Sequence, residues 1–228
     1  ICRMDIRLDG LHAVVGGGTQ GIGAATAQEM ARLGARVTIL GRDPAALAKS
    51  ISELDASGGR EHLSIAIDFM DTAALRTAIE AHVRMHGPID VLINNTGGPP
   101  PGPAHEAEPE AFEKAFRQHL IAFQTLVRAI VPGMKERRNG RIINVVSTSV
   151  KTPLPNLGVS NTVRGAVAQW AKTLANELGP FNITVNNVLP GATGTGRLQA
   201  IIHNKSVKDG VTEERAAEEM LREIPLRR

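Results

Sequence analysis

Short apolar runs alternate along the chain with longer segments in which apolar residues recur at helical spacing. The apolar runs predict six strands, over residues 11–15, 35–40, 63–67, 89–93, 141–146 and 183–188. The periodic segments predict helices over 24–33, after Asp43, after Asp71, from Pro109, over 160–178 and over 212–222. Strands that alternate with helices predict one α/β domain over residues 1–228, built on a doubly wound parallel sheet.

Aspartates and prolines punctuate this pattern. Asp43 and Asp71 stand directly before helical segments, and we expect each to cap its helix. Pro132 lies inside the helical segment that starts at Pro109, and we expect it to bend or end that helix. The proline-rich loop 99–103 and the polar segment 194–210 are expected to be irregular and to form the walls of a substrate site.

Residues suited to ligand binding gather directly after the predicted strands. In a doubly wound sheet, ligands bind outside the carboxyl ends of the strands, so residues that follow strands should line one edge. These residues are the glycines after the first strand, Arg42, Asp68, Asn94, Ser147 and Pro190. The sequence therefore predicts a binding site at the carboxyl edge of the sheet.

The first of these positions is rich in glycine. Five glycines lie between Gly16 and Gly23, after the apolar residues Val14 and Val15, and a helical segment follows at once. Glycine lets the backbone take positive φ and approach a ligand closely, and the first N–H groups of a helix attract phosphate. The segment thus predicts a pyrophosphate-binding turn, with a purely structural turn as the alternative.

Composition narrows the range of partners. The 228 residues carry a net charge of +3, contain 3% aromatic residues and no tyrosine, and include one cysteine, Cys2. Few aromatics argue against nucleic-acid binding, and a single cysteine argues against an internal disulfide or a cysteine-rich metal site. No apolar run approaches the length of a membrane span. We expect a cytoplasmic protein that binds a small-molecule substrate, with no nucleic acid, membrane or metal partner.

Taken together, these motifs resemble those of the short-chain dehydrogenase/reductase family, specifically its ketoacyl-reductase-like members, from about Leu8 to Thr195. The family's TGxxxGxG turn is present with Gly16 in place of threonine, and its NNAG motif appears as Asn94-Asn95-Thr96-Gly97. Its serine-bearing strand appears as Gly140 to Ser147, and its PGxxxT segment as Pro190 to Thr195. The resemblance implies a Rossmann fold, carbonyl–alcohol chemistry and a nicotinamide cofactor. It also implies homodimers or homotetramers formed through the long helices that contain Phe116 and Trp170.

The cofactor type depends on the end of the second strand. An acidic residue there accepts a hydrogen bond from the ribose 2′-hydroxyl of NAD, but this chain offers Arg42, which suits the 2′-phosphate of NADP. We therefore expect NADP(H) to be preferred over NAD(H), with a merely solvated Arg42 as the alternative. Asp68 would face the adenine, or would only close a turn, while Asn94 would contact the ribose and Thr195 the nicotinamide amide. The full set of expected cofactor-binding residues is Gly17, Thr19, Gln20, Gly21, Ile22, Gly23, Arg42, Asp68, Asn94, Gly97, Arg164, Pro190, Gly191 and Thr195.

The proton-transfer residues depart from the family pattern. The family uses a tyrosine as proton donor, with a lysine one helical turn later, but alignment on the helix places Ser160 and Arg164 at these positions. Ser147 is retained, and His119 stands where an asparagine usually supports the relay. An aliphatic hydroxyl is a far weaker acid than a phenol of pKa about 10, and arginine does not deprotonate usefully.

Three interpretations follow for the candidate catalytic residues Ser147, Ser160, Arg164 and His119. The chain is a reductase with an altered proton relay, or a cofactor-binding protein that has lost catalysis, or an interaction subunit. Individual residues also have plainer roles: Ser160 could cap its helix, His119 could be a core residue, and Arg164 could bind only ribose hydroxyls. The end of the chain, from Ile224 to Arg228, resembles a point where family members still have a helix and a last strand to come.

Overall fold

The computed structural model describes residues 6–222, 224 and 226, so Cys2 and residues 225, 227 and 228 lie outside the described part. The chain divides into two compact units, Ile1–Pro190 and Gly191–Arg228. The expectation of one domain over residues 1–228 stays a prediction.

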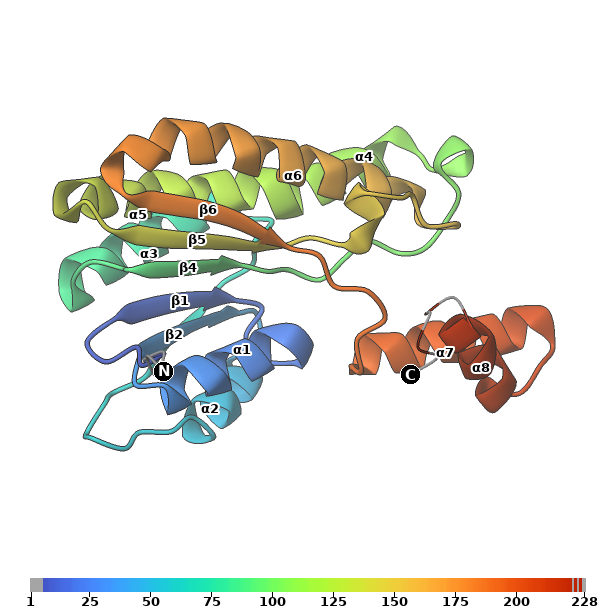
Figure 1. The fold of residues 1–228 in the computed structure, drawn as a ribbon, viewed down its shortest axis with the longest axis horizontal. Coiled ribbons are helices and arrows are strands. Elements are labelled where there is room, and N and C mark those ends of the chain that lie inside the picture. The colour runs from blue at the N-terminus through green and yellow to red at the C-terminus, as the bar shows by residue number, and fades with distance from the viewer. Residues whose placement is uncertain (1–5, 223, 225, 227–228) are drawn as a thin grey trace. The chain divides into compact units, whose positions relative to one another are not determined.

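The first unit contains a six-stranded sheet with the order β3-β2-β1-β4-β5-β6, in which every neighbouring pair is parallel (Figure 1). The strands are β1 (His12–Gly16), β2 (Arg36–Gly41), β3 (Leu63–Ala66), β4 (Val91–Asn94), β5 (Gly140–Val145) and β6 (Ile183–Val188). All six lie within a few residues of the predicted ranges, and the doubly wound Rossmann arrangement is confirmed. Successive strands are added towards one edge of the sheet from β1 to β3 and towards the other edge from β4 to β6, so the carboxyl ends of β1 and β4 form the topological switch point.

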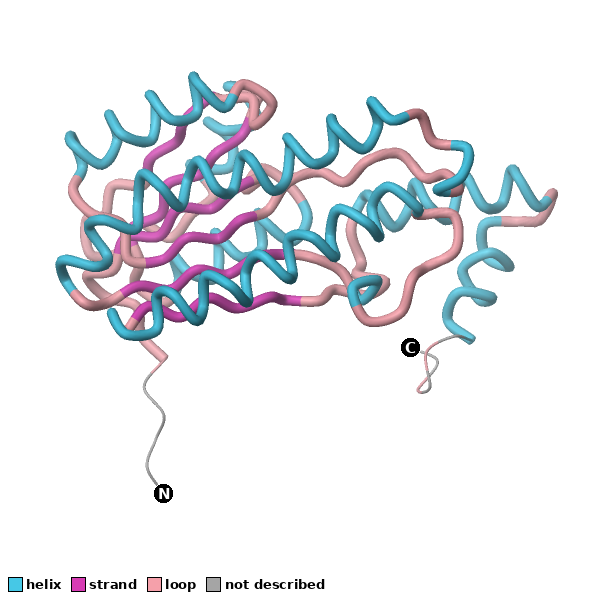
Figure 2. Tube along the Cα trace, turned by 90° about the horizontal axis from the view of Figure 1, so that it is seen from above, coloured by secondary structure: helices cyan, strands magenta, loops and turns pink. Residues whose placement is uncertain are grey.

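Helices cover both faces of this sheet (Figures 1 and 2). Those of the first unit are α1 (Gly21–Arg32), α2 (Pro44–Ser52), α3 (Thr72–His86), α4 (Pro109–Phe116), α5 (Ala122–Arg137) and α6 (Gly158–Leu178). Val14 of β1 packs in the core shared with α3, α5 and α6, whereas its neighbours Ala13 and Val15 pack in the core shared with α1 and α2. Successive strand residues point to opposite faces, so an apolar run without alternation serves both cores.

Helix starts follow local side-chain chemistry. Asp43 accepts a hydrogen bond from the backbone N–H of Ala45 at 2.9 Å, and Asp71 accepts one from Ala74 at 2.9 Å. Each carboxylate satisfies a donor that the first turn of a helix leaves unpaired, so both predicted caps are confirmed.

Two expectations about helix limits do not hold as stated. Of the two effects expected of Pro132, an end of the helix is wrong, because α5 continues through it to Arg137, with the side chains of Ile130 and Met134 buried on either side, and a bend stays a prediction. That burial offsets the hydrogen bond that proline removes. Ser160 does not cap α6, because the helix begins at Gly158 and Leu157 occupies the N-cap position.

The segment between α4 and α5 also differs from a regular α-helix. Residues Arg117–Ile121 form a π-helical turn, η2, that joins the two helices without a break. Such turns contain one more residue than an α-helical turn and are frequent at functional sites. Short 3₁₀ turns occur at Ala104–Glu106, Thr148–Val150 and Gly179–Phe181.

The second unit consists of two helices, α7 (Gly196–Asp209) and α8 (Glu213–Arg222), which contact each other. Lys205 on α7 pairs with Glu219 on α8 at 3.0 Å, and His203 pairs with Glu213 at 2.7 Å. The expectation of an irregular segment over 194–210 is therefore wrong for 196–209. Gly210, with φ of 64°, ends α7 in the left-handed conformation typical of a helix C-terminus.

Candidate functional site

The glycine-rich turn joins β1 to α1 and has no room for side chains. Gly17 and Gly21 have φ of 57° and 56°, where residues with a Cβ are strained. A Cβ on Gly23 would lie 2.2 Å from the carbonyl oxygen of Gly17, and one on Gly16 would lie 2.7 Å from that of Asn95. The backbone of this turn is therefore packed as closely as glycine alone permits.

Asn95 fixes the turn from the neighbouring strand. Its side-chain amide donates to the carbonyl oxygen of Gly16 at 3.0 Å, which joins the ends of β1 and β4 at the switch point. In the described part of the chain no side chain caps α1, whose N-cap residue Gln20 is extended, and no acidic residue stands in the first turn of this helix. The free N–H groups of α1 and the bare glycine backbone together fit a pyrophosphate group, since both supply donors without a competing carboxylate.

The other expected cofactor residues lie around this turn. Ile22 packs against the core, while Thr19 is half-buried and Gln20 is exposed. Arg42 directly follows β2 and is exposed, and none of the described residues forms an ion pair or hydrogen bond with its side chain. Asp68 is also exposed and accepts a hydrogen bond from the N–H of Met70 at 2.9 Å, which closes a turn. The turn role foreseen for Asp68 is confirmed, and its adenine contact stays a prediction.

Asn94 belongs to a ladder of asparagines across the sheet. Its side chain is fully buried and donates to Asn144 of β5 at 2.8 Å, and Asn144 donates in turn to Asn187 of β6 at 3.1 Å. The Oδ1 atom of Asn94 is buried without a hydrogen-bond partner among the described residues. Its contact with a ribose stays a prediction, as does that of Gly97, which is exposed and accepts a hydrogen bond from Gln118.

Ser147 stands at the end of β5, on the same edge of the sheet. It is half-buried, and its Oγ accepts a hydrogen bond from the N–H of Ser149 at 3.1 Å, which caps the short turn Thr148–Val150. The N–H of Thr148 donates to the carbonyl oxygen of Pro190 at 3.1 Å, so the segment after β6 is joined to the Ser147 turn. The hydroxyl proton of Ser147 remains available for donation to a substrate oxygen.

Arg164 reaches the same place from α6. It is buried, with 7% of its surface exposed, and its Nη1 donates to the carbonyl oxygen of Val145 at 2.7 Å. Val145 is the last residue of β5, so the guanidinium lies at the strand end that carries Ser147. Ser160 lies one helical turn earlier on α6 and is half-buried.

His119 occupies the π-helical turn and is fully buried. Its Nδ1 forms a hydrogen bond with Oγ1 of Thr96, which follows the end of β4, and its ring lies edge-on to Phe123 at 6.1 Å. Helix α6 packs against both η2 and the Thr148–Val150 turn, so it brings together the elements that carry Ser147, Ser160, Arg164 and His119.

Two expected cofactor residues belong to the second unit. Gly191 begins it, and Thr195 occupies the N-cap position of α7, where its side chain donates to the carbonyl oxygen of Thr193 at 3.2 Å. Their roles stay predictions. The structural partners Asn95 and Thr96 were not singled out as site residues, although both follow an apolar strand directly, the position that otherwise indicated site residues.

The described residues give no sign of two other kinds of site. No helix among them is both long and apolar enough to cross a membrane. In the same part of the chain, histidine, cysteine and carboxylate side chains nowhere gather in threes as metal ligands would.

Comparison with known proteins identifies the family. The family model described as short chain dehydrogenase matches residues 11–206. The 2,3-dihydro-2,3-dihydroxybenzoate dehydrogenase of Bacillus subtilis is 32% identical, over 82% of this chain and 72% of the relative. A candidate ketoacyl reductase of a monensin polyketide synthase from Streptomyces virginiae is also 32% identical, over 95% of this chain and 83% of the relative.

Solved structures agree with the sequence relatives. L-Sorbose reductase from Gluconobacter frateurii, in complex with NADPH and L-sorbose, superposes with a TM-score of 0.91 at 28% identity, covering 99% of this chain and 86% of that one. An NAD⁺-bound xylitol dehydrogenase gives a TM-score of 0.88 at 27% identity, covering 96% of this chain and 86% of that one. The chain therefore belongs to the short-chain dehydrogenase family and shares its Rossmann fold.

Proposed function

We propose that this protein is an NADP(H)-dependent oxidoreductase that reduces a ketone or 3-oxoacyl carbonyl, or oxidises the matching alcohol. The observation that carries the proposal is the shared position of two features at the carboxyl edge of one sheet. The tightly packed glycine turn follows β1, and Ser147 follows β5, with the guanidinium of Arg164 at the same strand end.

The residues around the glycine turn fit a dinucleotide. The backbone N–H groups of the turn and of the first turn of α1 would hold the pyrophosphate, because no side chain competes for them. The bound nicotinamide would supply or accept a hydride, which is the redox chemistry that this cofactor brings to any site. Solved structures of similar proteins bound to NADPH and to NAD⁺ support a nicotinamide cofactor, but they do not decide between NADP(H) and NAD(H).

Arg42 is the residue that we propose selects NADP(H). Its exposed guanidinium stands directly after β2 and has no protein carboxylate as a partner among the described residues. A guanidinium forms paired hydrogen bonds with a phosphate, and a charged hydrogen bond contributes about 1.5–3 kcal/mol. Loss of this contact should weaken NADPH binding by roughly 10–100-fold and leave NADH binding unchanged.

Ser147, Ser160, Arg164 and His119 form the proposed proton relay. The hydroxyls of Ser147 and Ser160 would hydrogen-bond the substrate oxygen, and the charge of Arg164 would stabilise the alkoxide that develops there. His119 is buried next to Thr96, and because an imidazole ring can carry a proton on either nitrogen, it would pass protons toward that oxygen through water. Because general-acid assistance is worth about 10²–10⁴ in rate, a relay without tyrosine predicts slow turnover.

The absence of tyrosine from the chain also favours a second candidate, an NADP(H)-binding protein without catalysis. Purified protein is tested by calorimetry with NADPH and NADH, then with NADPH and a panel of ketones and 3-oxoacyl thioesters. Turnover that falls for both Ser147→Ala and Arg164→Ala supports the reductase. Cofactor binding without turnover on any substrate supports the second candidate, and no dinucleotide binding contradicts both and leaves an interaction subunit.

The cofactor preference has its own control. Arg42→Ala should abolish the preference for NADPH, whereas Arg76→Ala, an exposed arginine on α3 far along the chain from the glycine turn, should preserve it. Equal affinities for NADPH and NADH in the unmodified protein would reject the proposed role of Arg42.

A homodimer or homotetramer formed through the helices of Phe116 and Trp170 is also proposed, and light scattering after size-exclusion chromatography tests it.

A further inference from the structure

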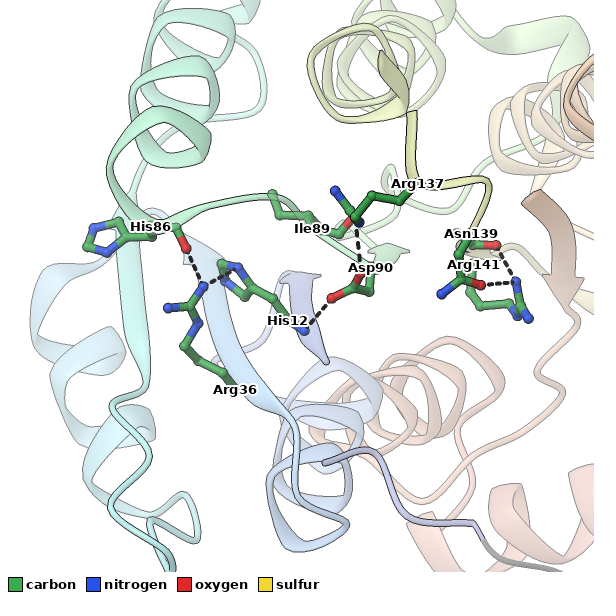
Figure 3. Close-up of polar contacts among 9 residues, drawn as sticks. His12, Arg36, His86, Ile89, Asp90, Arg137, Asn139 and Arg141 are labelled. Atoms are coloured by element: carbon green, nitrogen blue, oxygen red, sulfur yellow. Dashed lines mark hydrogen bonds and ion pairs between the residues drawn. The ribbon is translucent and has the colours of Figure 1, made fainter. Parts of the chain in front are cut away.

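A second polar site lies at the amino-terminal edge of the sheet, opposite the glycine turn. It is a pocket of about 480 Å³ whose charged lining consists of Arg36, Arg60, Arg137 and Asp90, with His12 beside them. His12 and Arg36 begin β1 and β2, Asp90 precedes β4, and Arg137 ends α5 (Figure 3). We call it the arginine pocket. Its volume falls in the range of small-molecule sites, which is about 300–1,000 Å³.

The two arginines nearest the strands are held by one nitrogen each. Nη2 of Arg36 donates to Nδ1 of His12 at 2.8 Å and to the carbonyl oxygen of His86. Nη2 of Arg137 donates to the carbonyl oxygen of Ile89 and to Oδ1 of Asp90, both at 3.0 Å (Figure 3). In both guanidinium groups, Nε and Nη1 form no hydrogen bond with any described residue.

Arg60 repeats this arrangement from the loop before β3. Its Nη2 donates to the carbonyl oxygen of Ala31 at 3.3 Å and to Oγ of Ser57 at 3.2 Å. Its Nε is buried and has no hydrogen-bond partner among the described residues. A buried donor without a partner costs about 1–3 kcal/mol, so a ligand that accepts from it would recover that free energy.

The charge of the pocket is unbalanced. Among the described residues, Asp90 is the only carboxylate in the lining, and both of its oxygens are engaged, one by Arg137 and the other by the backbone N–H of His12 at 2.9 Å. Asp9, which lies close to Gly34, is paired with Arg7 at 3.8 Å. Burial and the nearby Arg36 lower the pKa of His12 to about 3, so its ring is neutral. Three guanidinium groups against one carboxylate leave two positive charges.

We propose that the arginine pocket binds a small ligand with a doubly charged oxyanion group, either a phosphate or a pair of carboxylates. The Nε and Nη1 donors that remain on each guanidinium group point in different directions, so each arginine offers single charged hydrogen bonds, and an oxyanion with several oxygens would be held by donors from more than one arginine. The site is separate from the cofactor turn, because it lies at the opposite ends of the same strands, and the proposal stands whether or not the protein is a reductase.

The test is calorimetry on the full chain with pyrophosphate in one arm and succinate in the other. Saturable binding is expected, and Arg60→Gln should weaken it by about tenfold, the value of one charged hydrogen bond. Arg76→Gln, the matched control on the exposed face of α3, should leave the affinity unchanged. Tighter binding of pyrophosphate identifies a phosphate ligand, and tighter binding of succinate identifies a dicarboxylate.

Two outcomes overturn the proposal. One is the absence of saturable binding in both arms. The other is binding that Gly23→Ala removes while Arg60→Gln preserves it, because the anion would then occupy the glycine turn. Arg137→Gln serves as a second variant with the same expected loss if Arg60→Gln does not fold, as judged by circular dichroism.

Discussion

Protonation of His82 on unfolding should make the stability of the first unit depend on pH. The Nε2 atom of His82 is 3.0 Å from Oγ1 of the fully buried Thr38, which in turn lies 2.8 Å from Nε2 of His12. Since Arg36 donates to Nδ1 of His12, we assign the His12 proton to Nε2, which donates to Thr38. The Thr38 hydroxyl then donates to His82, whose acceptor nitrogen must be unprotonated.

The size of the effect follows from the pKa of His82. Burial, followed by the neighbouring His86 and Arg36, lowers it from 6.5 to about 4. The folded state therefore stays neutral while the unfolded state takes up a proton, and stability that is complete above pH 6.5 is lost as the pH falls towards 4. Between about pH 6 and 5, His82 binds about 0.9 proton more in the unfolded state than in the folded state. The free energy of unfolding therefore falls by about 1.2 kcal/mol for each pH unit.

Urea unfolding at about pH 6.0, 5.5 and 5.0, which lie within the range used for this estimate, measures the slope. His82→Gln keeps an acceptor for Thr38 but cannot titrate, so its free energy of unfolding should fall less steeply by about 1.2 kcal/mol per pH unit. His105→Gln, which replaces an exposed ring, should follow the unmodified protein. Parallel lines for His82→Gln and the unmodified protein would refute the assignment of His82 as neutral and buried.

Three further substitutions test other parts of the structure. Gly23→Ala drives a Cβ to 2.2 Å from the Gly17 carbonyl oxygen, so dinucleotide affinity in calorimetry should fall by about 1–3 kcal/mol, or roughly 5–150-fold. Unchanged affinity would show that the turn does not hold the cofactor. Thr38→Val leaves both buried histidines without their partner and should lower the urea-derived stability by about 2–4 kcal/mol. Asp71→Ala removes the cap of α3 and should cost about 1 kcal/mol by the same assay.

The strands and the caps could be predicted because their signals are local. The run from Ala13 to Val15 is apolar without alternation, which is what a strand covered on both faces requires. Asp71 needs only the N–H of Ala74 to cap its helix, a contact within one turn. The turn from Gly16 to Gly23 is visible through its glycines alone, although several of the contacts that they relieve are with the distant residues Ile39 and Asn95.

The remaining features depend on contacts that sequence patterns do not contain. The arginine pocket joins residues as distant along the chain as Arg36 and Arg137, which meet only because β1 lies between β2 and β4. The helix α7 has few buried side chains, so its apolar pattern is weak and the segment was expected to be irregular. The path of α5 through Pro132 follows from tertiary burial, which outweighs the local preference of proline.

The π-helical turn Arg117–Ile121 makes the length of this helix adjustable. Such a turn absorbs one surplus residue without changing the rotational phase of the helix on either side. Excision of one residue there would convert α4, the turn and α5 into one regular helix, whose buried face, including Phe123 and Leu126, would stay against the sheet. His119 would then be carried away from Thr96 while the core remained intact. Loss of a single residue at this position would therefore change the chemistry at the sheet edge, because His119 would lose its contact with Thr96.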